Sequence, residues 1–154
     1  MRRIRIAGEG DAEAVLRLII RTVDTSYSHV YSPRALAAFH RYHAPHRVAD
    51  RIASGSVVVV EEAGEVVATG ALVGSEVFAV FVSPDRQGEG LGAVVMDTLE
   101  ERAWAAGHAR ITLDSSLPAT QFYVHRGYTL HDRASLDVGE GETLDYYPAD
   151  KLLT

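Results

Sequence analysis

The sequence predicts an α/β fold of the α+β kind, in which helices cover both faces of a mixed, mostly antiparallel central sheet of six to seven strands. Three observations predict it. Two β-branched segments are joined by the tight turn Ala63-Gly64, which indicates a hairpin. A glycine-rich loop at residues 87–92 stands between a strand and a long helix. Beyond it, helices alternate with short strands, so the later strands are reached by crossovers.

The first third of the chain is predicted to be mostly helical. Residues 3–6 alternate between arginine and isoleucine, as a short strand does. Asp11 then opens a segment whose apolar side chains recur at helical spacing. One or two short helices are expected to follow, with starts near Pro33 and Pro45, because proline is favoured in a first helical turn.

The middle of the chain predicts three strands in succession, at residues 56–62, 65–73 and 76–82. Ser83-Pro84 ends the third, since proline cannot continue a central ladder. After the glycine loop, a helix is expected from about residue 91 to residue 106. Its apolar set is Leu91, Val94, Val95, Leu99 and Trp104.

The last part of the chain predicts shorter elements. A strand is expected at residues 110–114, a short helix at 117–125, and strands at 128–131 and 143–147. The chain of 154 residues suits one domain spanning residues 1–154.

Composition excludes several classes of protein. The formal net charge of −6 and the lack of a basic stripe argue against nucleic-acid binding. No apolar run approaches the roughly 20 residues of a membrane helix, and no segment of signal-peptide type follows the basic N-terminus. We therefore expect a cytoplasmic protein with no membrane partner. Cysteine is absent, which excludes disulfides and thiol catalysis.

The loop Gln87-Gly88-Glu89-Gly90-Leu91-Gly92 is an anion-binding arrangement. The first amides of a helix have no intrahelical partner, and the helix dipole places partial positive charge there. Glycines let the backbone curl close enough to present these amides to phosphate oxygens. Arg86 adds a cation nearby. The plainer interpretation is a glycine-rich turn that caps a helix, but three alternating glycines exceed what a cap requires.

Two phosphate ligands compete for this loop. Residues 88–93 satisfy the relaxed dinucleotide fingerprint, and Asp114 ends the next strand at a suitable distance to hold a ribose. One observation against a nicotinamide cofactor is that five residues, Ser83 to Gln87, separate the strand from the first glycine. The preceding strands also form hairpins rather than βαβ units, and the chain after Asp114 is too short for a second nucleotide-binding half.

Two motifs resemble the GCN5-related N-acetyltransferase (GNAT) family. Residues 82–92 resemble its coenzyme A loop, with Gln87, Gly90 and Gly92 at the pattern positions and a proline shortly before. Residues 119–128 resemble its second motif, an alanine followed by Phe-Tyr and then Gly-Tyr. The ordered pair covers about residues 76–128. The resemblance implies an acetyltransferase of GNAT fold that uses acetyl-coenzyme A as acyl donor.

The resemblance also implies which residues hold the coenzyme. Main-chain groups at the end of the third strand would pair with the pantetheine arm, loop amides would hold the pyrophosphate, and the second motif would pack along the arm. Asp114 or Ser115 stands where many members have asparagine. The cofactor residues so implied are Phe81, Val82, Ser83, Arg86, Gln87, Gly88, Glu89, Gly90, Leu91, Gly92, Ala93, Asp114, Ala119 and Tyr123.

The family's chemistry is direct attack of an amine on the thioester, which calls for an acid and a base. Tyr123 matches the position where many members carry a tyrosine that protonates the departing thiolate. Glu76 lies eleven residues before Gln87, the separation at which the histone-acetylating branch has a glutamate base. Deprotonation through a water without a dedicated base is the alternative. A non-catalytic coenzyme A sensor with this fold is the rival function.

The acyl acceptor, a small-molecule or peptide amine, is expected near the first helices. Asp24, Tyr27 and Tyr31 are candidates to hold its cationic group, by charge and by aromatic faces. His40, His43 and His46 fall close together, but no carboxylate or zinc motif accompanies them, so no metal is expected. Many members of the family form homodimers, and the oligomeric state stays open.

Overall fold

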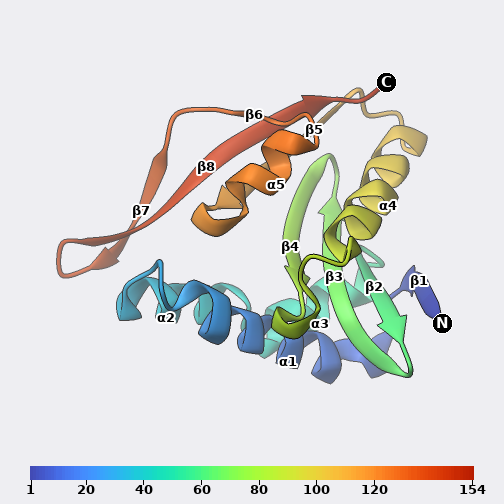
Figure 1. Cartoon of the computed structure of the whole chain (residues 1–154), viewed down its shortest axis with the longest axis horizontal. Coiled ribbons are helices and arrows are strands. Elements are labelled where there is room, and N and C mark those ends of the chain that lie inside the picture. The colour runs from blue at the N-terminus through green and yellow to red at the C-terminus, as the bar shows by residue number, and fades with distance from the viewer.

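A twisted sheet of eight strands runs through the computed structural model, which describes residues 1–154 (Figure 1). The strand order is β1-β2-β3-β4-β5-β8-β6, and β7 also pairs with β8. All neighbours are antiparallel except β4 and β5. The strands are β1 (Arg2–Ile6), β2 (Val57–Glu62), β3 (Glu65–Val73), β4 (Glu76–Val82), β5 (Arg110–Ser116), β6 (Thr129–Leu130), β7 (Ala134–Gly139) and β8 (Glu142–Leu152).

The predicted fold class is confirmed, with eight strands in place of six to seven. The additional strand comes from the hairpin of β7 and β8, where only one strand was expected, at residues 143–147. Most side chains of β7 are exposed or half-buried, so β7 lacks the apolar alternation that marks a strand in a sequence.

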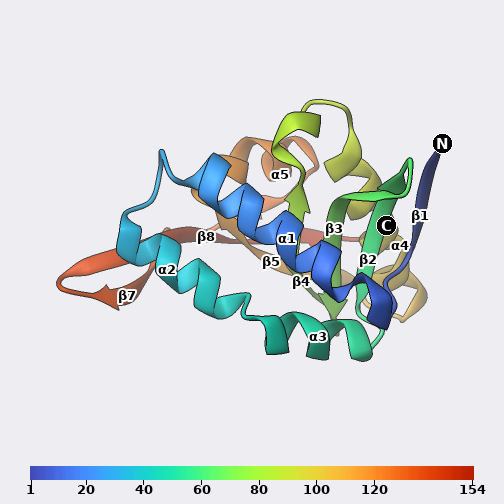
Figure 2. The same ribbon diagram turned by 90° about the horizontal axis from the view of Figure 1, so that it is seen from below.

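Helices cover both faces of the sheet, as predicted. The longer helices are α1 (Ala12–Thr22), α2 (Pro33–Tyr42), α3 (Pro45–Ala53), α4 (Leu91–Ala105) and α5 (Thr120–His125). The first three lie along one face, which Figure 2 shows from below, while α4 and α5 lie on the opposite side (Figures 1 and 2). Proline occupies the first turn of α2 and of α3, as expected. No helix is both long and apolar enough to cross a membrane.

The four valines of β2 serve two separate cores. Val58 and Val60 pack in a cluster with Val95 and Leu99 of α4, whereas Val57 and Val59 pack in the cluster that contains α1 and α3. Successive side chains of a strand point to opposite faces. A continuous β-branched run is therefore what a strand covered by helices on both faces requires.

The residues expected to form the apolar face of α4 are buried or packed against the core, except for the last of them. Leu91, Val95 and Leu99 are fully buried, but Trp104 is 56% exposed. Ala103 takes the buried place instead, because it lies four residues after Leu99 and therefore on the same face of the helix.

The parallel pair β4 and β5 is joined only near its start. Its register contains two residue pairs, Glu76 with Thr112 and Val77 with Leu113. Immediately afterwards β4 bulges: its register against β3 shifts between Phe78 and Phe81, and Ala79 adopts a φ of 53°. The two strands therefore part after their first two residues.

Gly70 of β3 allows α4 to lie close to the sheet. A Cβ added at Gly70 would sit 2.6 Å from Cγ1 of Val95. We expect Gly70→Ala to lower the free energy of unfolding by about 1–3 kcal/mol, since overpacking forces neighbours from their places. Urea denaturation measures this change.

Gly10→Ala is the matched control, because a Cβ there meets nothing within 4 Å. Its unfolding free energy should stay within about 0.5 kcal/mol of the parent value. Equal stability of the Gly70→Ala and Gly10→Ala proteins would contradict the close packing of α4 on β3.

Candidate active site

The glycine loop connects β4 to α4 through two residues in the left-handed region. Pro84–Arg86 forms a single helical turn after β4. Gly88 and Gly90 then each have a φ of 82°, a conformation that favours glycine. Gly90 is the N-cap of α4, and no side chain caps the helix. The first amides of this helix are therefore free to bind an anion.

A cavity of about 450 Å³, which we call the loop cavity, lies against this loop. Its walls come from the loop, the last residues of β4, the end of α1 and the start of α5. The main lining residues are Thr22, Val80, Phe81, Val82, Gln87, Gly88, Gly90, Leu91, Gly92, Ala93, Ala119, Phe122 and Tyr123.

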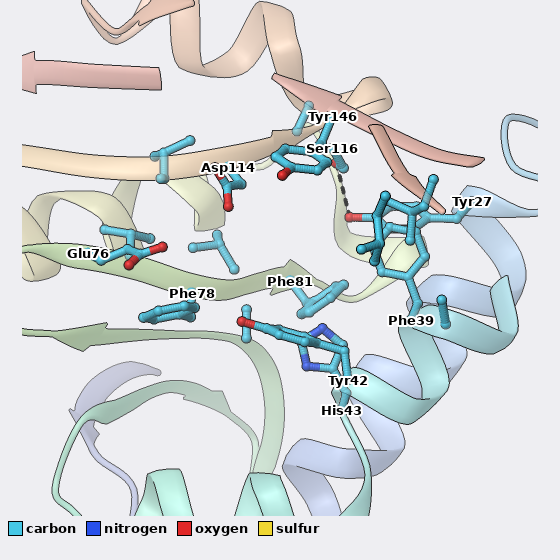
Figure 3. Close-up of a pocket in the computed structure, with 18 of the residues that line it drawn as sticks. Tyr27, Phe39, Tyr42, His43, Glu76, Phe78, Phe81, Asp114, Ser116 and Tyr146 are labelled. Atoms are coloured by element: carbon cyan, nitrogen blue, oxygen red, sulfur yellow. Dashed lines mark hydrogen bonds between the residues drawn. The ribbon is translucent and has the colours of Figure 1, made fainter. Parts of the chain in front are cut away.

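A second cavity of about 300 Å³ lies beside the first, and we call it the carboxylate cavity (Figure 3). Glu76 and Asp114 lie toward one end, and aromatic side chains form much of the remaining wall. The two cavities adjoin where β4 and β5 have parted. The residues that line both are Tyr27, Val80, Phe81, Ser116, Ala119 and Tyr123.

Tyr123 stands at the junction of the two cavities. It is buried, with 7% of its surface exposed. Burial raises the pKa of its hydroxyl above the ordinary value, the nearby Tyr27 raises it further, and only Arg126 acts against this. No hydrogen bond contributes to the shift. Tyr123 therefore presents a neutral phenol that can donate a proton.

Glu76 and Asp114 form a pair of like charges in a mainly apolar cavity. Burial raises the pKa of Glu76, and the charge of Asp114 raises it further. The pKa of Asp114 is raised by burial. No cation or hydrogen-bond donor offsets these effects at either group. A positively charged ligand would therefore stabilise both carboxylates.

His43 lines the carboxylate cavity as a neutral imidazole. Arg51 donates a hydrogen bond of 3.0 Å to its Nδ1, which leaves the ring proton on Nε2. Burial lowers the pKa of His43 to about 3, with the charge of Arg51 acting in the same direction. The sequence drew attention to His43 only as one of three neighbouring histidines.

Most of the predicted cofactor residues lie together around the loop cavity. Among them are Phe81, Val82, Ala119, Tyr123 and every residue of 87–93 except Glu89. Gly92 packs closely against α5, because a Cβ there would lie 3.1 Å from the ring of Phe122, which would have to shift by a few tenths of an ångström. The side-chain Nε2 of Gln87 donates a hydrogen bond of 3.4 Å to the main-chain oxygen of Val82.

The side chains of three predicted cofactor residues point to other partners. Ser83 donates its amide proton to Val67 O at 2.8 Å and its hydroxyl proton to Asp85 at 2.6 Å. Arg86 forms ion pairs with Glu62 and, at 2.9 Å, with Glu89. These ion pairs turn the charge of Arg86 away from the cavity, and none of the three predicted residues lines it.

Asp114 lies in the carboxylate cavity with Glu76 and does not line the loop cavity. The structure thus places it away from the coenzyme position implied by its place in the sequence. Side chains of neighbouring strand residues face opposite sides of the sheet, and Ser115, not Asp114, is the fully buried neighbour.

The structure places the three residues predicted to bind the acceptor in different surroundings. Tyr27 lines both cavities and donates a hydrogen bond of 3.2 Å to Oγ of Ser116 (Figure 3). Asp24 is more than half exposed, bonds to His40 at 2.8 Å, and lines neither cavity. The hydroxyl of Tyr31 donates to the carbonyl of Asp145 at 3.1 Å and accepts from the amide of Leu117 at 2.8 Å. Tyr31 thereby ties the helical region to β8.

Sequence reasoning missed the aromatic wall of the carboxylate cavity. Phe39 and Tyr42 come from α2 and its end, Phe78 comes from β4, and Tyr146 comes from β8 (Figure 3). A helical period shows that Phe39 and Tyr42 are one turn apart, but no pattern in one sequence shows that Tyr146 faces them. No group of three or more potential metal ligands is gathered anywhere in the structure.

A family model described as an acetyltransferase (GNAT) domain matches residues 27–139. No curated protein matches the chain at a significant level. Among solved structures, a GCN5-related N-acetyltransferase (aminotransferase, class-II) from Rhodopseudomonas palustris has a TM-score of 0.89 at 25% identity, covering 99% of this chain and 96% of that one.

Two further structures share the fold. The PaiA N-acetyltransferase of Thermoplasma acidophilum, solved in complex with coenzyme A, has a TM-score of 0.79 at 12% identity, with 99% of both chains covered. YncA of Salmonella typhimurium, solved with acetyl-CoA as its cofactor, has a TM-score of 0.69 at 21% identity, covering 100% of this chain and 95% of that one.

The environment of His43 predicts an imidazole that stays neutral at physiological pH. Because its pKa is lowered to about 3, we expect its ring nitrogen signals to stay constant from pH 8 to pH 5 in ¹⁵N NMR spectra, with Nε2 protonated and Nδ1 bare. Between pH 8 and pH 5, His43 would bind an additional proton only in the unfolded chain. Folding stability should therefore decline as the pH falls below about 6.5. A His43 midpoint near 6.5 would contradict the buried position.

Proposed function

The chain belongs to the GNAT acetyltransferase family, and from this premise we propose that it transfers the acetyl group of acetyl-coenzyme A to a primary amine by direct attack. One observation carries the proposal: a loop cavity suited to a phosphate-bearing ligand meets a carboxylate cavity at Tyr123. Coenzyme A and acetyl-CoA in two proteins of the same fold support the identity of the donor. We also propose that residues 1–154 form one acetyltransferase domain.

The coenzyme would lie along the loop cavity. Its pyrophosphate would accept hydrogen bonds from the free amides at the start of α4, where the helix dipole favours negative charge. Its pantetheine arm would follow the edge of β4 from Val82 to Val80, which β5 leaves unpaired. Arg86 is held by Glu62 and Glu89, so main-chain amides rather than this guanidinium would supply most of the contacts to phosphate.

The amine would enter through the carboxylate cavity. An alkyl ammonium with a pKa of roughly 10 must lose a proton before it can attack. Glu76, whose pKa is raised by burial and by Asp114, or a water beside it would accept that proton. Burial among apolar walls thus gives Glu76 a stronger affinity for the proton than an exposed carboxylate has.

The neutral nitrogen would then attack the thioester carbon. A C–N bond forms, the C–S bond breaks, and the departing sulfur takes a proton from the hydroxyl of Tyr123. The nitrogen loses its second proton as the amide forms and Tyr123 regains a proton, so the protonated amine and acetyl-coenzyme A give the amide, free coenzyme A thiol and one released proton. A phenol held neutral by burial is a suitable donor for this step.

Tyr123→Phe removes the proposed acid and keeps the ring. We expect kcat for thiol release to fall by about 10²-fold or more, in the range seen for general acids. Binding of coenzyme A, followed by calorimetry, should change little, because the hydroxyl has no hydrogen bond that holds the fold.

Tyr147→Phe is the control, since Tyr147 lines neither cavity and should keep the parent kcat. An unchanged kcat for Tyr123→Phe would remove Tyr123 from the mechanism. Tight coenzyme binding without thiol release across a broad panel of amines would instead support the coenzyme A sensor.

The raised pKa of Glu76 predicts an acid limb in the pH dependence of kcat/KM. The base acts when ionised, so activity should rise with pH through a midpoint above the ordinary glutamate value of about 4.3. Glu76→Gln should lower the rate and abolish this limb. If the limb persists unchanged in Glu76→Gln, the base is not Glu76, and a water or Asp114 takes its place.

A further inference from the structure

The carboxylate cavity is chemically divided. Of its 19 lining residues, 15 are hydrophobic, and its only carboxylates are Glu76 and Asp114. Figure 3 shows both acids toward one end, with Phe78 below Glu76 and the rings of Tyr42, Phe81, Phe39 and Tyr27 extending away from them. A ligand that fills this space needs a charged end and an apolar body.

The aromatic wall is built of rings that hold one another in place. Tyr42 meets His43 edge-on at 4.9 Å, and His43 meets Phe81 in the same way at 5.3 Å. Tyr27 and Phe39 stand edge to face at 5.0 Å. Such packing fixes the rings relative to one another and gives a preformed apolar surface on which another ring can pack.

The carboxylate cavity has no cationic side chain that could pair with a carboxylate on the acceptor. No arginine or lysine lines it, and His43 stays neutral because burial and the charge of Arg51 lower its pKa. An acceptor carboxylate would face Glu76 and Asp114 without a cation to pair with. Amino acids are therefore poor candidates on electrostatic grounds.

Long polyamines fit poorly for a different reason. Each further ammonium would need its own carboxylate or water, and beyond Glu76 and Asp114 the walls are mainly hydrophobic. The volume of about 300 Å³ is also at the low end for small-molecule sites. A compact acceptor with one cationic group matches both the size and the charge.

We propose that the acyl acceptor is a small arylalkylamine: a primary amine on a short chain that carries an aromatic ring and no carboxylate. Its ammonium would lie between Glu76 and Asp114, and its ring would pack on Phe78 and the wall formed by Tyr42 and Phe39. Tyr123, buried and without a hydrogen-bond partner, lies in the same cavity and completes the site. This inference rests on the proposed acetyltransferase function and names its substrate class.

The test compares acceptors that differ in one group. Purified protein with acetyl-coenzyme A is assayed for thiol release with 2-phenylethylamine, with L-phenylalanine, which adds only a carboxylate, and with spermidine. We expect kcat/KM for 2-phenylethylamine to exceed that for L-phenylalanine by at least about 100-fold, because the negative charges of Glu76 and Asp114 repel the added carboxylate and no cation of the cavity pairs with it. Spermidine should also be the poorer substrate.

A variant of Asp114 tests whether the carboxylate cavity causes the preference for 2-phenylethylamine over L-phenylalanine. Asp114→Asn keeps the shape of the side chain and removes one negative charge, so KM for 2-phenylethylamine should rise about tenfold and the preference over L-phenylalanine should narrow. Asp50→Asn, at an exposed site on α3, should leave both quantities unchanged. Thermal unfolding of both variants identifies any loss of the fold.

The outcomes separate the two proposals. Turnover of L-phenylalanine or spermidine as fast as that of 2-phenylethylamine would overturn the arylalkylamine inference and leave the acetyltransferase function standing. An unchanged preference in a folded Asp114→Asn protein would also overturn the assignment of the charged end. Absence of thiol release with every amine, despite bound coenzyme A, would overturn the proposed function itself and this inference with it.

Discussion

The separation of β4 from β5 is the constraint on which the rest of the site depends. Only two residue pairs join these parallel strands, and the bulge at Ala79 begins directly after them. A non-glycine residue in the left-handed region costs roughly 1–2 kcal/mol. Strain of this kind persists where the surrounding structure enforces it, and functional sites are where it gathers. Here it turns the edge of β4 away from β5 and opens the space that both cavities share.

The two halves of the sheet hold this space open from opposite sides. β4 pairs along most of its length with β3, and helices on both faces pin it through separate apolar cores. β5 pairs with β8 over its full length, from Arg110 to Ser116. Each strand therefore has a complete partner on its outer side, and the inner edges stay apart. Unpaired backbone groups on those edges need partners, which an extended ligand arm carrying amide groups can supply.

The sequence is most informative where local chemistry alone determines structure. The strands at residues 65–73 and 76–82 and the glycine loop follow from β-branched runs, turn residues and positive φ, and all appear as predicted. The missed hairpin of β7 and β8 turns through Glu140 and Gly141, but its first strand is largely exposed and has no apolar period. The residues that line one cavity are harder to predict. Asp114 and Glu76 lie 38 positions apart in the sequence, and only the parallel pairing of β4 with β5 brings them together.

The division of the site between two cavities matches what an acyl transfer demands of its proton donors and acceptors. The nucleophile and the leaving group occupy different sides of the carbon that is attacked, so a base and an acid that serve them cannot share one position. Glu76 lines only the carboxylate cavity, whereas Tyr123 lines both. Burial keeps the phenol neutral and makes the carboxylate a better proton acceptor. The same apolar walls that raise these pKa values also form the surface available to the acceptor. The choice of substrate and the tuning of the base are thus two consequences of one packing arrangement around the gap between β4 and β5.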